Sequence, residues 1–120
     1  MMHPGGERIQ KRDKLLKRSK FLYLARYGHS VHNRYFVVAY CSNRFGRPRL
    51  GVTVTRKIGG AVVRNRLKRI VREYFRRHRH QIGESRDINV IAKKAAANVS
   101  TGQAFAALEY LFGKIREHTD

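Results

Sequence analysis

Acidic residues are scarce in this sequence. Only 8 of its 120 residues are Asp or Glu, against 27 Lys and Arg, which leaves a formal net charge of +19 at pH 7. Self-repulsion at such a charge works against a compact state, so we expect a polyanionic partner. Lys and Arg that neutralise phosphates release counterions, and such binding weakens steeply as salt rises. Nucleic acid and an anionic membrane surface are the two candidate partners.

The few acids and the single cysteine also limit the chemistry that the side chains can perform. A nuclease that uses its own residues needs clustered carboxylates for magnesium, or a His placed as an acid or base. His78 and His80 are two positions apart, so they do not share a helix face, and Cys41 alone makes no disulfide or zinc framework. We therefore expect no catalytic residue and no metal site in the protein. The acids are scattered, with no Asp-x-Asp or Glu-x-Glu grouping: Glu7, Asp13, Glu73, Glu84, Asp87, Glu109, Glu117 and Asp120.

Long apolar runs are also missing. None approaches the roughly 20 residues of a membrane-spanning helix, and the first residues carry no hydrophobic stretch before a small-residue cleavage site. We therefore expect a cytoplasmic protein that does not bind a membrane. Pro4, Gly5, Gly6 and scattered charges predict a flexible basic arm over residues 1–13, followed by a single domain over residues 14–120.

Two strands are predicted in the first half of the chain. Residues 35–41 are rich in β-branched and aromatic side chains, and residues 50–55 alternate Leu or Val with Gly or Thr. Asn43, Gly46 and Pro48 supply turn chemistry between them. We therefore expect these two strands to form an antiparallel hairpin.

Three helices and a further strand are predicted around this pair. Ser19 is expected to cap a short helix over residues 21–25 that Gly28 ends in the left-handed conformation. Residues 87–92 form an apolar run suited to a strand, and Ser100 with Gln103 makes a capping-box start for a final helix. The order of elements predicts an α+β sandwich with helices on a small sheet. The core side of the final helix should comprise Phe105, Leu108, Phe112 and Ile115.

The central helix has one apolar and one basic side. Val63, Leu67, Ile70, Val71 and Tyr74 recur at helical spacing after Gly59 and Gly60. Like charges four residues apart along the basic side cost stability, so mere solvation explains them poorly, although Glu73 and Arg77 have the spacing of an ordinary surface pair. We therefore predict that this side binds phosphates. It comprises Asn65, Lys68, Arg69, Arg72 and Arg76, with Arg64 and Arg66 at its flanks.

A continuous motif leads into this helix. It spans residues 51–69, Gly-Val-Thr-Val-Thr-Arg-Lys-Ile-Gly-Gly-Ala-Val-Val-Arg-Asn-Arg-Leu-Lys-Arg, and continues through Arg72, Glu73 and Phe75 to Arg76. The motif resembles the signature of the bacterial ribonuclease P protein family. Residues 16–21, the strand at 87–92 and the final helix also match the family's elements. The resemblance implies a mostly antiparallel sheet of about four strands, three helices and a left-handed βαβ crossover.

The family resemblance also implies a function. Its members join a large RNA to form the endonuclease that removes 5′ leaders from precursor tRNA, with Mg²⁺ held mainly by the RNA, which supplies the active site. The expected partners are ribonuclease P RNA and precursor tRNA, with no protein partner required. The implied contacts with the RNA subunit are Arg64, Asn65, Arg66, Lys68 and Arg69, to which the basic face adds Arg72 and Arg76. The implied contacts with the leader are Phe21, Phe36, Val37, Arg56 and Lys57.

Two other functions share part of this pattern. A ribosomal or other structural RNA-binding protein would have the same size, charge and basic helix. A membrane-active cationic protein would have the charge, but the predicted strands and core do not favour it.

Overall fold

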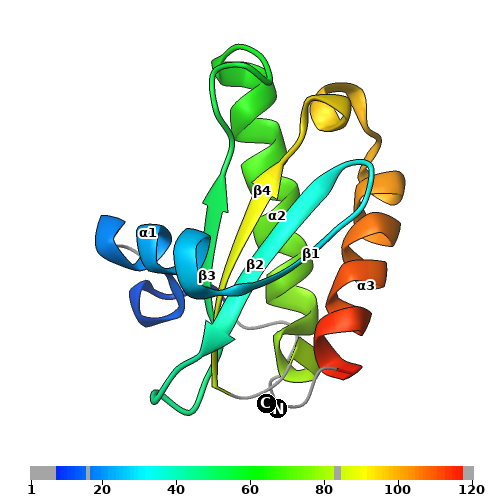
Figure 1. Cartoon of the computed structure of the whole chain (residues 1–120). Helices are drawn as coiled ribbons and strands as arrows, with labels where there is room; N and C mark the ends of the chain where they lie inside the picture. The colour runs from blue at the N-terminus through cyan, green and yellow to red at the C-terminus, as the bar shows by residue number, and fades with distance from the viewer. Residues whose placement is uncertain (1–7, 16, 83–84, 118–120) are drawn as a thin grey trace.

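A four-stranded sheet with helices on both faces makes up the described part of the protein (Figure 1). The computed structural model describes residues 8–15, 17–82 and 85–117. The strands are β1 (His29–His32), β2 (Phe36–Ser42), β3 (Arg49–Thr53) and β4 (Arg86–Ala92), and the helices are α1 (Arg18–Tyr27), α2 (Ala61–Ile82) and α3 (Thr101–Glu117). Two 3-10 helices, η2 (Lys11–Asp13) and η3 (Lys94–Asn98), complete it. Within these ranges, no helix combines the length and apolarity needed to cross a membrane.

The strand order is β1-β2-β4-β3, so β4 lies in the middle of the sheet. It pairs antiparallel with β2 and parallel with β3, while β1 pairs antiparallel with β2. The predicted mostly antiparallel sheet is confirmed, but the hairpin predicted between residues 35–41 and 50–55 is wrong. The connection between these strands passes over the start of β4, where the backbone N–H of Asn43 donates to the backbone carbonyl of Ser85 at 2.8 Å.

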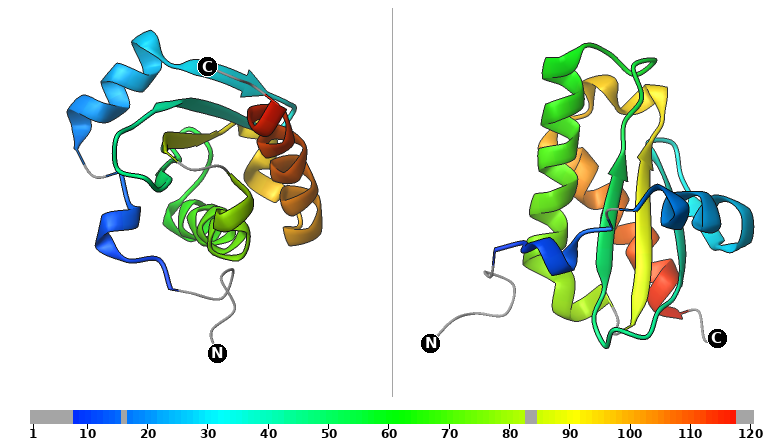
Figure 2. Two further views of the ribbon diagram at one scale, coloured as in Figure 1. Left: turned by 90° about the horizontal axis from the view of Figure 1, so that it is seen from below. Right: turned by 90° about the vertical axis from the view of Figure 1, so that its left-hand side faces the viewer.

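The crossover from β3 through α2 to β4 is left-handed. Figure 1 shows β4 to the right of β3 with α2 behind the sheet, and both views of Figure 2 place α2 on the face opposite α1. Both strands point upward in Figure 1. Viewed from the side of α2 with the strands still pointing up, β4 therefore lies to the left of β3. Nearly all parallel crossovers have the opposite hand, and the family resemblance predicted this exception correctly.

The main core lies between the sheet and the α2–α3 layer. Side chains alternate along β2, so Phe36, Val38 and Tyr40 are buried on this face. The Ser100–Gln103 capping box is confirmed at the start of α3, with Gln103 N–H donating to Ser100 Oγ at 3.1 Å. The α2 and α3 side chains fully buried in this core include Leu67, Tyr74, Phe75, Leu108, Leu111, Phe112 and Ile115.

A smaller apolar cluster lies under α1 on the opposite face. Leu15, Leu24 and Ala39 are buried there, and Phe21 and Cys41 pack against them half-buried. Alternate residues of the strands point to this side, and α1 packs on β2, on β4 and, through Phe21, on Gly51 of β3. A hollow remains beside Phe21 at the edge of β3.

The ends of α1 differ from the prediction. The helix begins at Arg18 after Lys17, so Ser19 lies inside it and does not cap it. Gly28 has φ −75°, which is not left-handed. Its lack of a side chain is required by space, because a Cβ there would lie 2.7 Å from the Leu24 carbonyl oxygen. The chain then enters β1 directly, a strand that the sequence analysis missed.

Part of the predicted basic arm packs onto the domain. Asp13 is buried. Its carboxylate accepts a hydrogen bond from the backbone N–H of Gln10 and forms an ion pair with Arg79 of α2 at 3.0 Å. Leu15 N–H donates to the Leu50 carbonyl at 2.8 Å, so the chain joins the edge of β3. Residues 8–15 are therefore fixed across that edge, while residues 1–7 lie outside the described residues.

Candidate functional site

The basic side of α2 borders an open hollow of about 540 Å³, here called the α2 hollow. Arg8, Ile9 and Lys14 from the segment before α1 form its other wall. The structure therefore places five of the predicted RNA-contacting residues around one concave surface. The floor of this surface is α2, whose apolar side packs in the main core. These five are Asn65, Lys68, Arg69, Arg72 and Arg76.

Arg64 and Arg66 lie beside the α2 hollow and do not line it. Arg64 Nε donates to the Gly59 carbonyl at 3.2 Å, which ties this side chain to the turn before α2. Arg66 Nη2 donates to the Val99 carbonyl, between η3 and α3. Both guanidinium groups therefore have a structural contact, and both flank the basic face as the sequence predicted.

Glu73 is the one acid that lines the α2 hollow among the described residues. Its carboxylate accepts hydrogen bonds from Arg76 at 2.7 and 2.8 Å and from Arg77 at 2.7 Å. The hydrogen bonds from Arg76, aided by Arg77, lower the pKa of Glu73 to about 2. Glu73 therefore stays ionised at neutral pH, and its charge is compensated by Arg76 and Arg77.

A second surface, here called the α1 cleft, lies between α1 and the sheet. Phe21 is half-buried there with its ring over Gly51 of β3, and Val37 of β2 is half-buried on the same face. A hollow of about 110 Å³ beside Phe21 is also lined by Lys14 and Arg72, which line the α2 hollow too. The two surfaces are therefore continuous around the edge of β3.

Phe36 does not belong to the α1 cleft. It is 0% exposed and lies in the main core, on the face of the sheet covered by α2 and α3. Its neighbour Val37 necessarily points the other way, because successive side chains of a strand alternate between faces. The predicted contact between Phe36 and the leader is therefore wrong.

Replacing Gly51 by Ala should displace the ring of Phe21. A Cβ at this position would lie 2.5 Å from Phe21 Cε1 and 3.3 Å from Leu15 Cβ. Overpacking of this kind costs about 1 to 3 kcal/mol, which urea unfolding followed by circular dichroism would measure. Gly102→Ala is the control, because a Cβ there meets nothing within 4 Å. Equal unfolding midpoints for the Gly51 variant and the wild type would show that Phe21 does not sit on Gly51.

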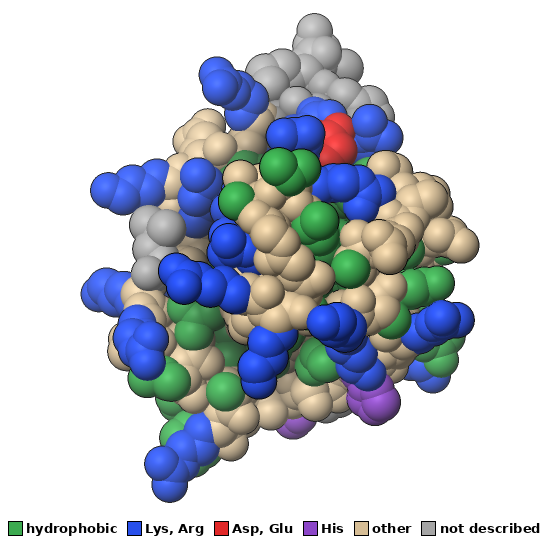
Figure 3. Space-filling model, turned by 90° about the horizontal axis from the view of Figure 1, so that it is seen from above, with side chains coloured by type: hydrophobic (Ala, Val, Ile, Leu, Met, Phe, Trp, Pro, Cys, Tyr) green, Lys and Arg blue, Asp and Glu red, His purple; other side chains and the backbone are tan. Residues whose placement is uncertain are grey.

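More basic residues surround the end of the sheet where β3 leads into α2. Figure 3 looks onto this end and shows Lys and Arg side chains spread over the visible face, with very little red. Arg56 and Lys57, two predicted leader contacts, are exposed in the turn after β3. Lys94 Nζ donates to the Lys57 carbonyl at 3.1 Å, and Lys93 follows β4 at the same end. The sequence analysis missed Lys93 and Lys94, although a Lys pair directly after a predicted strand was a usable signal.

Asp87 lies at the opposite end of the sheet, where it holds the structure together. Asp87 at the start of β4 is 1% exposed and accepts two hydrogen bonds from Arg49, at 2.8 and 2.9 Å, and one from Asn43 at 2.9 Å. Burial by itself would raise the pKa of Asp87, but the hydrogen bonds from Arg49 and Asn43 outweigh it and lower that pKa. The pair fixes the β2–β3 loop to the middle strand of the sheet.

This pair predicts a loss of stability in acid. Because the pKa of Asp87 in the folded protein lies below its ordinary value of 3.8, the unfolded chain binds more protons in the window between them. The contribution of Asp87 is therefore complete above about pH 4 and is lost as pH falls below it. Urea unfolding should be followed at pH 7 and pH 3. The midpoint of Asp87→Asn should lie well below that of the wild type at pH 7, and this difference should narrow at pH 3. Glu117→Gln, at the exposed end of α3, should show no gap at either pH.

The remaining acids that the structure places are also spread out. Glu109 accepts a hydrogen bond from Tyr74 at 3.1 Å and contacts Arg116 at 3.4 Å, far along the chain from Asp87, Glu73 and Asp13. Across residues 8–15, 17–82 and 85–117, no three His, Cys, Asp or Glu side chains gather in a way that could hold a metal ion.

Comparison with known proteins identifies the family. A family model described as Ribonuclease P matches residues 9–116. The chain belongs to the ribonuclease P protein family. The ribonuclease P protein component of Desulfatibacillum aliphaticivorans is 46% identical over 113 residues, 94% of this chain and 96% of that protein.

Solved structures of ribonuclease P proteins have the same fold. A mutant of the Staphylococcus aureus RNase P protein is 39% identical, with a TM-score of 0.81 over 87% of this chain and 88% of its own. The RNase P protein of Thermotoga maritima is 38% identical, with a TM-score of 0.76 over 91% of this chain and 97% of its own. The resemblance read from residues 51–76 is therefore confirmed over nearly the whole chain.

Proposed function

We propose that this protein is the protein subunit of ribonuclease P, which binds the catalytic RNA through the α2 hollow and the 5′ leader of precursor tRNA through the α1 cleft. The observation that carries the proposal is the α2 hollow. It brings Lys68, Arg69 and Arg72 together on one rigid helix, beside an aromatic side chain on the adjoining face. Family membership supports the same reading.

The two surfaces suit different parts of an RNA complex. Arg presents a planar fork to phosphate oxygens and Lys a point charge, so the α2 hollow fits the phosphates of a folded RNA. Phe21 offers a ring on which a base can stack, and stacking tolerates any sequence because every base has a π-face. Arg56 and Lys57 are exposed in the turn that follows β3, the strand against which the ring of Phe21 lies, and there they would bind the phosphates of the leader.

In the proposed complex, the RNA carries out hydrolysis and the protein contributes binding. The dispersed acids support this division, because two-metal phosphodiester hydrolysis needs carboxylates or phosphates held close together. The described residues do not fit a magnesium ion, so Mg²⁺ would be held mainly by RNA phosphates. The protein would lower the free energy of the complex by neutralising phosphates and retaining the leader, in the cytoplasm where precursor tRNA is made.

Reconstitution tests the proposal. Purified protein is mixed with ribonuclease P RNA and a precursor tRNA at low magnesium, and leader release is followed on a gel. We expect a large stimulation over RNA alone, with no other protein required. A lack of stimulation, together with tight binding to ribosomal RNA, would favour a structural RNA-binding protein. Binding to anionic vesicles as strong as binding to RNA would favour a membrane-active protein.

A further inference from the structure

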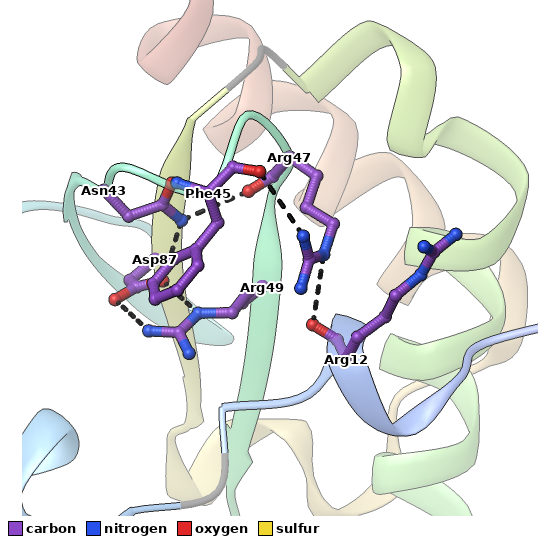
Figure 4. A network of polar contacts seen from close by, with 6 residues as sticks. All are labelled: Arg12, Asn43, Phe45, Arg47, Arg49 and Asp87. Atoms are coloured by element: carbon purple, nitrogen blue, oxygen red, sulfur yellow. Dashed lines mark hydrogen bonds and ion pairs between the residues drawn. The ribbon is translucent and has the colours of Figure 1, made fainter.

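A second basic hollow, here called the loop hollow, lies between the segment before α1 and the β2–β3 loop. It has a volume of about 310 Å³ and is lined by seven Lys and Arg side chains and two apolar ones, Leu15 and Phe45. Figure 4 shows η2 between this loop and α2, so the α2 hollow lies beyond it. Glu73 lines the α2 hollow, whereas no acid among the described residues lines the loop hollow.

Phe45 is the unusual member of this surface. Its side chain is 49% exposed although it is surrounded by cations. The guanidinium carbon of Arg49 lies 4.1 Å from the centre of the ring, and that of Arg47 lies 5.7 Å from it. One side of the ring is thus covered by a cation, and the exposed half faces solvent.

The structure holds this ring in place from beneath. Two hydrogen bonds to buried Asp87 fix the guanidinium of Arg49, which therefore gives the Phe45 ring a fixed surface to pack on. Asn43 Oδ1 accepts the Phe45 N–H at 2.9 Å, and Asn43 Nδ2 donates to the Arg47 carbonyl at 3.1 Å. An exposed aromatic ring that is fixed before any partner arrives loses little entropy on binding.

We infer that the loop hollow binds single-stranded RNA, with one nucleobase stacked on the exposed side of Phe45 and the flanking phosphates bound by the surrounding Lys and Arg. A base between a ring and solvent gains stacking energy whatever its identity. The Arg49 guanidinium beneath the ring adds a cation next to the stacked pair. Lys17 and Lys20 on one wall and Arg47 on the other supply charges for phosphates on both sides of the base.

The loop hollow adjoins the α1 cleft. Lys14 and Leu15 line both the loop hollow and the hollow beside Phe21. A strand of RNA that passes Phe21 therefore reaches Phe45 along one wall. If the proposed function holds, the RNA at Phe45 is an upstream part of the 5′ leader. The binding of single-stranded RNA at this site does not depend on that identification.

Fluorescence anisotropy of the full chain with a labelled oligoadenylate of about 12 nucleotides, a length within the usual range of single-strand sites, tests the inference. Phe45→Ala should weaken binding by about 5- to 150-fold, the effect of losing one stacked base. Its salt slope should not change, because no charge is lost. Arg47→Ala should instead lower the slope by about 0.7, the value for one phosphate contact on a single strand.

Matched controls isolate stacking from folding. Phe45→Tyr keeps a ring and should retain wild-type affinity. An abasic oligonucleotide has no base to stack, so wild type and Phe45→Ala should bind it equally if the loop fold is intact. Tyr110→Ala removes another exposed aromatic, 57% exposed with Lys114 5.4 Å from its ring centre, but outside the loop hollow, and should change nothing. Unchanged affinity of Phe45→Ala would overturn the inference. The inference would also be overturned if Phe45→Ala lost as much affinity for the abasic oligonucleotide as for oligoadenylate. If Phe45→Ala lost affinity only for polyglutamate, a stand-in for an acidic protein, the ring would belong to a protein-binding surface instead.

The reconstituted holoenzyme separates this inference from the proposed function. With precursor tRNAs carrying leaders of about 2 and about 12 nucleotides, Phe45→Ala should raise KM only for the longer leader. Normal stimulation, with no effect of Phe45→Ala on either precursor tRNA or on oligoadenylate binding, would overturn the inference and leave the proposed function standing. Oligonucleotide binding that depends on Phe45, without any stimulation of cleavage, would support the inference and contradict the proposed function.

Discussion

Replacing Lys68, Arg69 and Arg72 together by Ala should weaken binding of ribonuclease P RNA by about three orders of magnitude at moderate salt. All three line the α2 hollow, where the carboxylate of Glu73 is hydrogen-bonded to Arg76 and Arg77. Each charge-assisted contact with a phosphate contributes about 1.4 kcal/mol or more, which is a factor of ten in affinity. The slope of log K against log salt should fall by about 0.7 to 0.9 for each lost contact. Filter binding over a range of salt concentrations would measure both.

The control removes the same charge from other surfaces. Arg26, Lys114 and Arg116 lie on α1 and α3 and line none of the three hollows. Their triple replacement by Ala should lower the affinity slightly, through net charge alone. If both triple variants lose the same affinity and the same slope, the RNA subunit does not bind specifically at the α2 hollow.

Leu67→Ala should destabilise the fold by about 2 to 5 kcal/mol and leave the salt slope unchanged. Leu67 is 0% exposed on the apolar side of α2, so its truncation leaves a cavity in the main core. Val62→Ala is the matched control on the same helix, because Val62 is 84% exposed and its loss should change stability by less than about 0.5 kcal/mol. Urea unfolding followed by circular dichroism would measure both variants. Equal destabilisation of the two would contradict the orientation of α2.

Local patterns predicted the elements whose structure depends on nearby residues. The spacing of Leu67, Ile70 and Tyr74 predicted both the existence of α2 and the side that is buried. Ser100 and Gln103 predicted the start of α3, because a capping box is a contact between residues three positions apart. The basic side of α2 followed from the same periodicity, so most of the α2 hollow was visible in the sequence.

Long-range pairing was not predictable in the same way. Turn residues such as Asn43 and Gly46 favour a tight hairpin, but they do not reveal that β4, more than 40 residues later in the sequence, takes the place beside β2. β1 is only four residues long and mostly exposed, so it lacks a clear alternation. The sequence also leaves open which face of β2 meets α1. The family resemblance assigned both Phe36 and Val37 to the leader, although successive side chains of a strand face opposite sides and only one of the two can lie in the cleft. The contribution of residues 8–15 to all three hollows depends on Asp13 meeting Arg79, a contact between distant residues.

The central position of β4 has a consequence for how the protein is made. β2 and β3 share no pairing of their own and are joined only through β4, whose synthesis ends at residue 92 of 120. Before that moment the nascent chain has only the β1–β2 hairpin, and an isolated hairpin is marginally stable in water. The segment that forms α2 emerges earlier with all of its positive charge but without the sheet that orients it. A truncated chain is therefore a loose polycation, and the ordered binding surfaces exist only once translation is nearly complete.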